Sequence, residues 1–131
     1  MPLYGVAQAG FNGPPNQGLN LTSLIPGESI VLFDGTETPS IGLASVAFAR
    51  GYSPSANDAG TSFDIKGMPA GMTVDVQAAN QNLDAAYCSF ITLSPDSNGN
   101  ANTTDPGRSA FYRLKISAYT SGAMCVGIAQ R

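Results

Sequence analysis

Short strand-like segments separated by turn residues recur at intervals of about ten residues from residue 28 to the end of the chain. This pattern constrains the fold most, because no segment sustains the 3.6-residue repeat of an amphipathic helix. The predicted strands are Glu28–Asp34, Ile41–Phe48, Thr61–Ile65, Met72–Gln77, Tyr87–Leu93, Phe111–Tyr119 and Ala123–Ala129. About seven such strands predict an all-β domain, an antiparallel β-sandwich that is either immunoglobulin-like or a jelly roll.

Alternation within these segments predicts which side chains face the core, since successive strand residues point to opposite faces of a sheet. The predicted inward residues are Phe63, Ile65, Met72, Val74, Val76, Tyr112, Leu114, Ile116, Met124, Val126 and Ile128. Asp64, Asp75, Arg113 and Lys115 fall on the solvent face.

Turn residues predict which strands are neighbours. We expect the strands at 61–65 and 72–77 to pair through the connection 67–71, and residues 120–122 to close a hairpin before the last strand. Only residues 78–86 are expected to turn helically, for one or two turns that cross between the sheets.

Residues 1–27 do not follow the strand pattern. They are rich in Gly, Pro and Asn, which interrupt regular structure, yet they include about eight sizeable apolar side chains. We therefore predict an irregular N-terminal arm at 1–27 and a β-sandwich domain at 28–131. Such an arm packs either on its own domain or on a neighbouring subunit. In the second case the interface candidates are Leu3, Tyr4, Phe11, Leu19 and Leu21.

Charge and composition narrow the function classes. The chain of 131 residues has a net charge of −3, and only 11% of its residues are charged. This weak acidic balance disfavours nucleic acid, and the scattered cations and short apolar runs disfavour a membrane partner. The chain has no His, which removes the commonest general base and a frequent metal ligand. We expect a non-enzymatic protein with no catalytic, cofactor-binding or metal-binding residues.

Cys88 and Cys125 both lie in strand-like apolar segments. The first residues lack the cationic and unbroken apolar regions of a signal peptide, so we expect synthesis in a cytoplasm. In a reducing compartment, two buried free thiols are favoured over a disulfide between them. We therefore expect both cysteines to be reduced and largely buried.

The oxygen-rich stretch Asp96–Asp105 resembles a calcium-binding loop in composition. Its spacing differs from an EF-hand, which has Gly at the sixth loop position and Glu at the twelfth. We predict a mobile hydrophilic hairpin loop here instead.

A pair of carboxylates and one lysine amine are candidates for catalytic groups. Asp64 and Asp75, expected on adjacent strands, are the residue types that a glycosidase uses as acid and nucleophile. Their polar surroundings, with Lys66 as a cross-strand partner, favour an ordinary wet sheet face. Lys115 beside Arg113 is weighed as an activated amine, but on an exposed strand it is solvated.

Five aromatic residues offer a possible sugar-stacking platform, because aromatic faces bind apolar faces of ligands. They are Tyr52, Tyr87, Phe111, Tyr112 and Tyr119. Core packing is expected to account for most of them.

Three segments carry a resemblance to known proteins. They are Thr61–Gln77 (TSFDIKGMPAGMTVDVQ), Ala86–Tyr87 and Tyr112–Gly122 (YRLKISAYTSG). In this order of strand and turn residues the chain resembles small β-sandwich virion proteins of tailed bacteriophages, of the head decoration or accessory type. The resemblance implies a non-enzymatic protein bound to a capsid or tail lattice, and it implies no catalytic or ligand residue.

The expected function is therefore that of a virion structural protein, a capsid decoration or stabilising component that acts through contacts between subunits. The expected partners are the major capsid protein or another virion protein and further copies of the chain, as a homo-oligomer for which we expect a trimer. It is expected in the virion after synthesis in the host cytoplasm. The alternative is a carbohydrate-binding or adhesive β-sandwich module.

Overall fold

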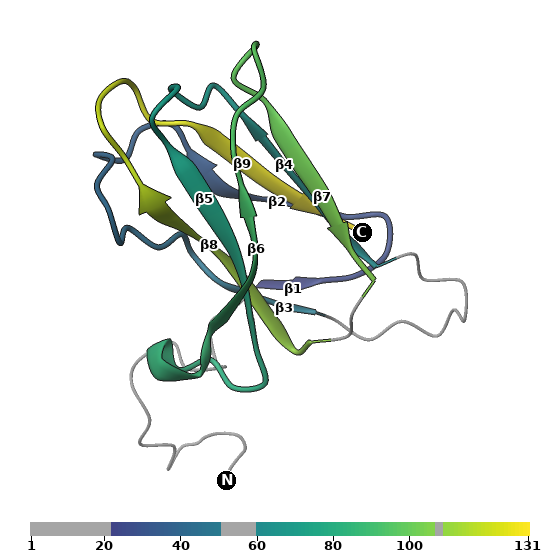
Figure 1. The fold of residues 1–131 in the computed structure, drawn as a ribbon. Coiled ribbons are helices and arrows are strands. Elements are labelled where there is room, and N and C mark those ends of the chain that lie inside the picture. Colours follow the sequence, from purple (N-terminus) through teal and green to yellow (C-terminus); the bar gives the residue numbers. More distant parts are fainter. Residues whose placement is uncertain (1–21, 51–59, 107–108) are drawn as a thin grey trace, which may run out of the picture.

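The computed structural model describes residues 22–50, 60–106 and 109–131 (Figure 1). The interface candidates Leu3, Tyr4, Phe11, Leu19 and Leu21 lie outside the described residues. The described part contains nine strands and one short 3-10 turn, η1 (Asp84–Ala86). The strands are β1 (Thr22–Leu24), β2 (Ser29–Asp34), β3 (Phe48–Arg50), β4 (Thr61–Lys66), β5 (Thr73–Ala79), β6 (Cys88–Leu93), β7 (Ala101–Asp105), β8 (Phe111–Ala118) and β9 (Val126–Gln130).

These strands form a β-sandwich, as predicted. One sheet has five strands in the order β1-β3-β8-β5-β6, and the other has four in the order β2-β9-β4-β7. All ladders are antiparallel except that of β1 with β3. Figure 1 shows the two layers stacked face to face, with β6 and β7 at the same side of the sandwich.

The pairing order distinguishes the two predicted architectures. The chain pairs β5 with β6, β4 with β7, β3 with β8 and β2 with β9, so each ladder is nested within the next. Such nesting describes one long antiparallel ribbon folded over into two sheets. It is the order of a jelly roll, with β1 as an additional short edge strand.

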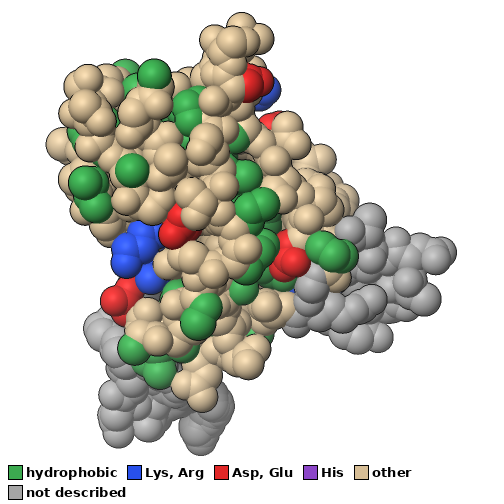
Figure 2. Space-filling model, in the orientation of Figure 1, with side chains coloured by type: hydrophobic (Ala, Val, Ile, Leu, Met, Phe, Trp, Pro, Cys, Tyr) green, Lys and Arg blue, Asp and Glu red, His purple; other side chains and the backbone are tan. Residues whose placement is uncertain are grey.

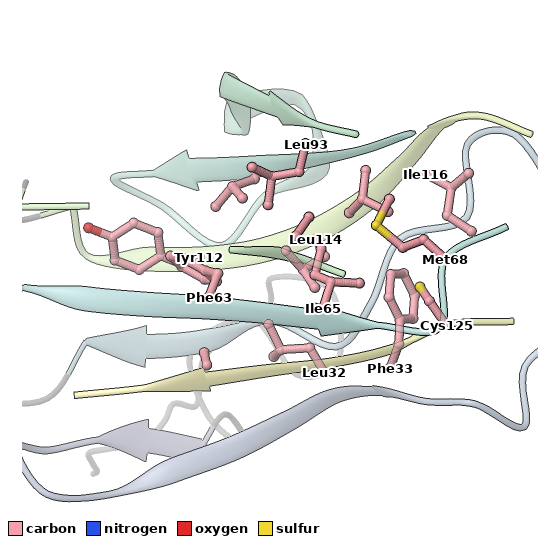
Figure 3. Close-up of a cluster of buried hydrophobic side chains, with 14 of the residues drawn as sticks. Leu32, Phe33, Phe63, Ile65, Met68, Leu93, Tyr112, Leu114, Ile116 and Cys125 are labelled. Atoms are coloured by element: carbon pink, nitrogen blue, oxygen red, sulfur yellow. The ribbon is translucent and has the colours of Figure 1, made fainter. Parts of the chain in front are cut away.

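The core fills the space between the sheets. Phe63 and Ile65 from β4 meet Tyr112 and Leu114 from β8, and all four are fully buried (Figure 3). Phe48 joins this group, stacking on Tyr112 with ring centroids 5.6 Å apart. All the residues predicted to face inward on β4, β5 and β8 are thus confirmed as buried.

The two hairpins predicted from turn residues are wrong. β4 pairs with β7 and β9, whereas β5 pairs with β6 and β8, so residues 67–72 connect the two sheets instead of closing a hairpin. Residues 119–125 likewise lead from β8 in one sheet to β9 in the other. Met68 and Met72 belong to the first connection and are buried, and this burial favours a crossing between the sheets over a solvated turn.

The segment 41–48 is not the buried strand that its apolar run predicted. Only its last residue, Phe48, begins β3, and Ile41 and Val46 are 68% and 59% exposed. Gly42 has a φ of 92°, which interrupts an extended strand. An isolated bridge from Ala44 to Lys115 holds the segment along β8.

Two strands lie where none was predicted. β7 occupies the second half of the predicted hydrophilic loop, where its polar residues pair with β4. β1 lies in the segment assigned to the irregular arm, and its Leu24 is 1% exposed and belongs to the core.

The predicted facing of β9 is also wrong. Gly127 and Ala129 are buried, whereas Val126 is 37% exposed. A Cβ at Gly127 would lie 2.6 Å from a methyl carbon of Leu114, so the absence of a side chain allows β9 to approach β8 across the core.

The 3-10 turn η1 joins two strands of the same sheet, so it does not cross between sheets. Both cysteines are free; Cys125 is buried as predicted, but the predicted burial of Cys88 is wrong. Cys88 is exposed because it begins β6, the edge strand of its sheet.

Candidate functional site

The outer face of the five-stranded sheet carries a hydrogen-bonded polar network. Its centre is Arg113 of β8, which was predicted to be solvated but is 8% exposed. Its guanidinium lies 4.1 Å from the centroid of the Tyr87 ring, and its Nε donates to Gln77 Oε1 at 2.7 Å. A second guanidinium nitrogen forms an ion pair with the exposed Asp84 of η1 at 2.8 Å. The turn η1 and Tyr87, which directly follows it, therefore cover this cation.

The network continues across β5 and β6. Gln77 Nε2 donates to Ser89 Oγ at 3.1 Å, and Ser89 in turn donates to Asp75 Oδ2 at 2.8 Å. Thr92 donates to the other oxygen of Asp75 at 2.7 Å. A continuous chain of polar contacts thus runs over three strands, and Figure 2 shows basic side chains on this face flanked by acidic ones.

The environment of Asp75 favours its ionised form. Partial burial acts to raise its pKa, but hydrogen bonds from Thr92, Ser89 and Ser117 and the charge of Lys115 lower the pKa below its ordinary value of 3.8. A general acid needs the opposite shift, so this carboxylate is suited to holding the sheet surface in place.

The structure separates Asp64 and Asp75, the two candidate carboxylates of a glycosidase pair. Asp64 is exposed on β4 of the four-stranded sheet, whereas Asp75 lies on the outer face of the other sheet. The expectation that they lie on adjacent strands is wrong, because β4 and β5 belong to opposite layers. The two carboxylates therefore do not flank a single site where a glycosidic bond could lie between them.

A hollow of about 400 Å³ opens at the side of the sandwich where the edges β6 and β7 diverge. We call it the β6–β7 hollow; its lining residues are Ala78, Ala79, Asn80, Ala86, Cys88, Phe90, Asp105 and Ser109. Figure 2 shows hydrophobic side chains gathered between β6 and β7, beside an acidic group.

Asp105, which lines the β6–β7 hollow, links the two sheets. The Tyr112 hydroxyl donates to Asp105 Oδ2 at 2.6 Å, linking β8 to β7. Burial and the adjacent Asp105 raise the pKa of Tyr112 to about 12, so its hydroxyl stays protonated and keeps donating at neutral pH. Phe90 stands edge-on to the Tyr112 ring and is 44% exposed, so this hollow offers an accessible aromatic side chain.

The predicted aromatic platform does not assemble among the described residues. Arg113 covers the ring of Tyr87, and the Tyr119 hydroxyl donates to the Gly122 carbonyl at 2.7 Å. Tyr112 is buried in the core, and Tyr52 lies outside the described residues.

The first half of the predicted hydrophilic loop is organised by Asp96. Its carboxylate accepts hydrogen bonds from the backbone N–H groups of Asn98 and Asn100 at 2.8 and 3.0 Å. These two bonds lower the pKa of Asp96. The carboxylate therefore closes a tight turn. Within residues 22–50, 60–106 and 109–131, no group of three or more His, Cys, Asp or Glu side chains has the geometry to hold a metal ion.

The outer face of the four-stranded sheet carries exposed apolar side chains. Val31 of β2 and Val126 of β9 are 50% and 37% exposed, and Ile128 of β9, the ladder partner of Val31, is half-buried. A polar depression of about 260 Å³ lies on the same sheet over β4 and β7, and its lining residues include Asp64 and Gln130.

Sequence reasoning missed both the buried cation and the β6–β7 hollow. Alternation placed Arg113 outward correctly, but no local pattern indicated that Asp84, Tyr87 and Gln77 would cover it. The uncharged sequence of β6, CSFITL, was the available signal that this edge differs from an ordinary solvated strand.

Comparisons with known proteins add no identity: the chain matches no protein-family model, no curated protein and no solved structure. In the part of the chain that the structure describes, no helix is long and apolar enough to cross a membrane.

Proposed function

We propose that the protein is a non-enzymatic virion structural protein, a capsid decoration or stabilising component of a bacteriophage that acts through contacts between subunits. The observation that carries this proposal is the nested jelly-roll order of the strands, an architecture used by viral capsid proteins. Fold alone does not determine function, so the proposal also depends on the surfaces of the sandwich and on the resemblance to virion proteins.

The outer face of the five-stranded sheet suits a lattice contact. Arg113, Gln77 and Asp75 are held by several partners each, so docking against this face would cost little side-chain ordering. Such a preorganised face contributes specificity, and repetition on a particle multiplies weak contacts.

The N-terminal arm supplies the second contact of the proposal. Its interface candidates are Leu3, Tyr4, Phe11, Leu19 and Leu21, and their burial on a neighbouring copy or on the major capsid protein would stabilise a homo-oligomer, which we propose is a trimer. The protein would be made in the host cytoplasm and reside in the virion.

The test is to locate the protein on purified particles by electron cryo-microscopy and to measure its oligomeric mass by light scattering. We expect oligomers that the double substitution Phe11→Asp and Leu19→Asp dissociates. The matched control, Asn12→Asp with Asn16→Asp, adds the same charge to polar positions and should leave the mass unchanged. A protein absent from particles, or an unchanged mass in the Phe11 and Leu19 variant, would contradict the proposal.

A carbohydrate-binding module is the second candidate, and the β6–β7 hollow favours it. Phe90 offers an aromatic face beside Asn80, Asp105 and Ser109, which supply polar groups for hydroxyls. A glycan array tests it: a specific ligand whose signal is lost on Phe90→Ala and kept on Val126→Ala would place this candidate first.

A further inference from the structure

The strand β6 is an unguarded sheet edge. It is six residues long, carries no charge and no proline, and among the described residues it forms a ladder with β5 only. The other edges are guarded: β1 is three residues long, β2 follows Glu28 and ends in Asp34, and β7 ends in Asp105. Exposed edges without such guards pair readily with another strand.

The β6–β7 hollow lies directly beside this edge. Phe90 and Cys88 of β6 and Ala78 and Ala79 of β5 give it an apolar wall. An added strand would gain backbone hydrogen bonds from β6, and its side chains on one face would enter the hollow. This combination of ladder and pocket is the usual way in which a sheet edge binds an extended peptide.

The chain itself contains a segment of matching chemistry. Twenty-one residues precede β1, and the first charged side chain of the chain is Glu28, so this segment is as uncharged as β6. Its residues 3–13 contain no proline and include Leu3, Tyr4 and Val6. Such a stretch can donate to a ladder along its length, and its apolar side chains fit an apolar hollow.

The position of β1 favours exchange between copies. β1 and β6 are the two opposite edges of the five-stranded sheet, four strand spacings or about 19 Å apart. A path from β1 to β6 of the same molecule over the outer face would cover the polar network around Arg113 and Asp75 with apolar residues, at a desolvation cost. A path outward from the β1 edge to a neighbouring molecule avoids this cost.

We propose that residues 1–21 of one copy add an extended strand to β6 of a neighbouring copy and place apolar side chains in its β6–β7 hollow. The inference rests on the proposed assembly role and names its acceptor site. Because the donor and acceptor surfaces differ, each copy gives to one neighbour and receives from another. Such a head-to-tail contact closes into a ring when the rotation allows it, as in a trimer.

The labelling rate of the Cys88 thiol can measure this contact. Its thiol lines the hollow and is exposed, whereas Cys125 is buried and silent. The experiment measures the rate of maleimide labelling of Cys88 in the full chain at micromolar and at submillimolar protein concentration. We expect the rate to fall at least tenfold at the higher concentration, because neighbouring copies then fill the hollow.

Two pairs of variants test the two sides of the contact. Tyr4→Asp on the donor segment and Phe90→Asp on the acceptor should each abolish the concentration dependence. Their matched controls, Gln8→Asp and Val126→Asp, should retain it: Gln8 is polar, and Val126 lies outside the hollow on the other sheet. Circular dichroism verifies that each variant is folded.

The outcomes separate this inference from the function it rests on. A labelling rate that is the same at both concentrations, or equal loss of protection in a variant and its control, overturns the inference. If Phe11→Asp with Leu19→Asp dissociates the oligomer while Cys88 stays equally reactive in all states, only the acceptor site is wrong. If the chain does not assemble at all, the proposed function fails as well.

Discussion

Replacing Arg113 with Met should destabilise the fold more than the loss of a surface charge would. Arg113 is 8% exposed, donates to the 7% exposed Gln77 and stacks on Tyr87. Met keeps the packing of the aliphatic stem but removes the donor and the cation. The buried Gln77 oxygen would then lack this hydrogen bond.

The expected loss of unfolding free energy is about 1.5–5 kcal/mol. An unsatisfied buried acceptor costs about 1–3 kcal/mol, and the cation–π contact with Tyr87 contributes about 0.5–2 kcal/mol. The ion pair with Asp84 adds little, because the Asp84 side chain is 86% exposed and water screens it. Lys115→Met, which removes an equal charge from the same strand, should cost less than about 1 kcal/mol.

Urea denaturation followed by far-UV circular dichroism measures these differences, since the chain has no Trp to report fluorescence. Asp84→Asn completes the series, because it removes the ion pair but keeps Arg113 on Tyr87 and Gln77. The reasoning is refuted if Arg113→Met costs no more than Lys115→Met, or if Asp84→Asn costs as much as Arg113→Met.

Three further outcomes are expected. Gly60→Ala should destabilise by more than about 3 kcal/mol in urea denaturation, because its new Cβ meets the Asp105 carbonyl oxygen, whereas Gly42→Ala, at a similar positive φ but in open space, should cost only about 1–2 kcal/mol. In thiol titration of the monomer Cys88 should react in the native state and Cys125 only after unfolding, because burial raises the pKa of Cys125 to about 11; equal native reactivity would contradict this. The folded-state pKa of Asp75 lies below 3.8, so the stabilisation of the fold by this carboxylate is complete above that pH and is lost as the pH falls further. Asp75→Asn should therefore flatten the acid limb of a curve of unfolding free energy against pH. An unchanged acid limb would contradict this role of Asp75.

Local alternation was sufficient to predict the all-β class, most of the strands and much of the core. Phe63 and Ile65, like Val74 and Val76, face inward because successive residues of a strand point to opposite sides and only one side was apolar. Such patterns depend on neighbouring residues alone, so they are visible in the sequence.

Strand partners were decided by contacts between distant segments. Residues 67–72 read as a hairpin connection, yet β4 and β5 belong to opposite sheets because Met68 and Met72 are buried where the chain crosses the end of the core. β7 escaped prediction because its polar residues lack a strand pattern and depend on pairing with β4.

The surfaces with chemical character were likewise decided by the tertiary structure. Arg113 lies on the outward face that alternation predicted, but its burial comes from its ladder partner Gln77 and from Asp84 and Tyr87, which the β5–β6 connection brings over β8. Cys88 lies in an apolar segment of the sequence, as core residues do. It is nevertheless exposed, because β6 is a sheet edge beside the β6–β7 hollow. The sequence by itself determined which residues are strand-forming and apolar; the order of the strands decided which of them are covered, since coverage depends on the layer that packs against them.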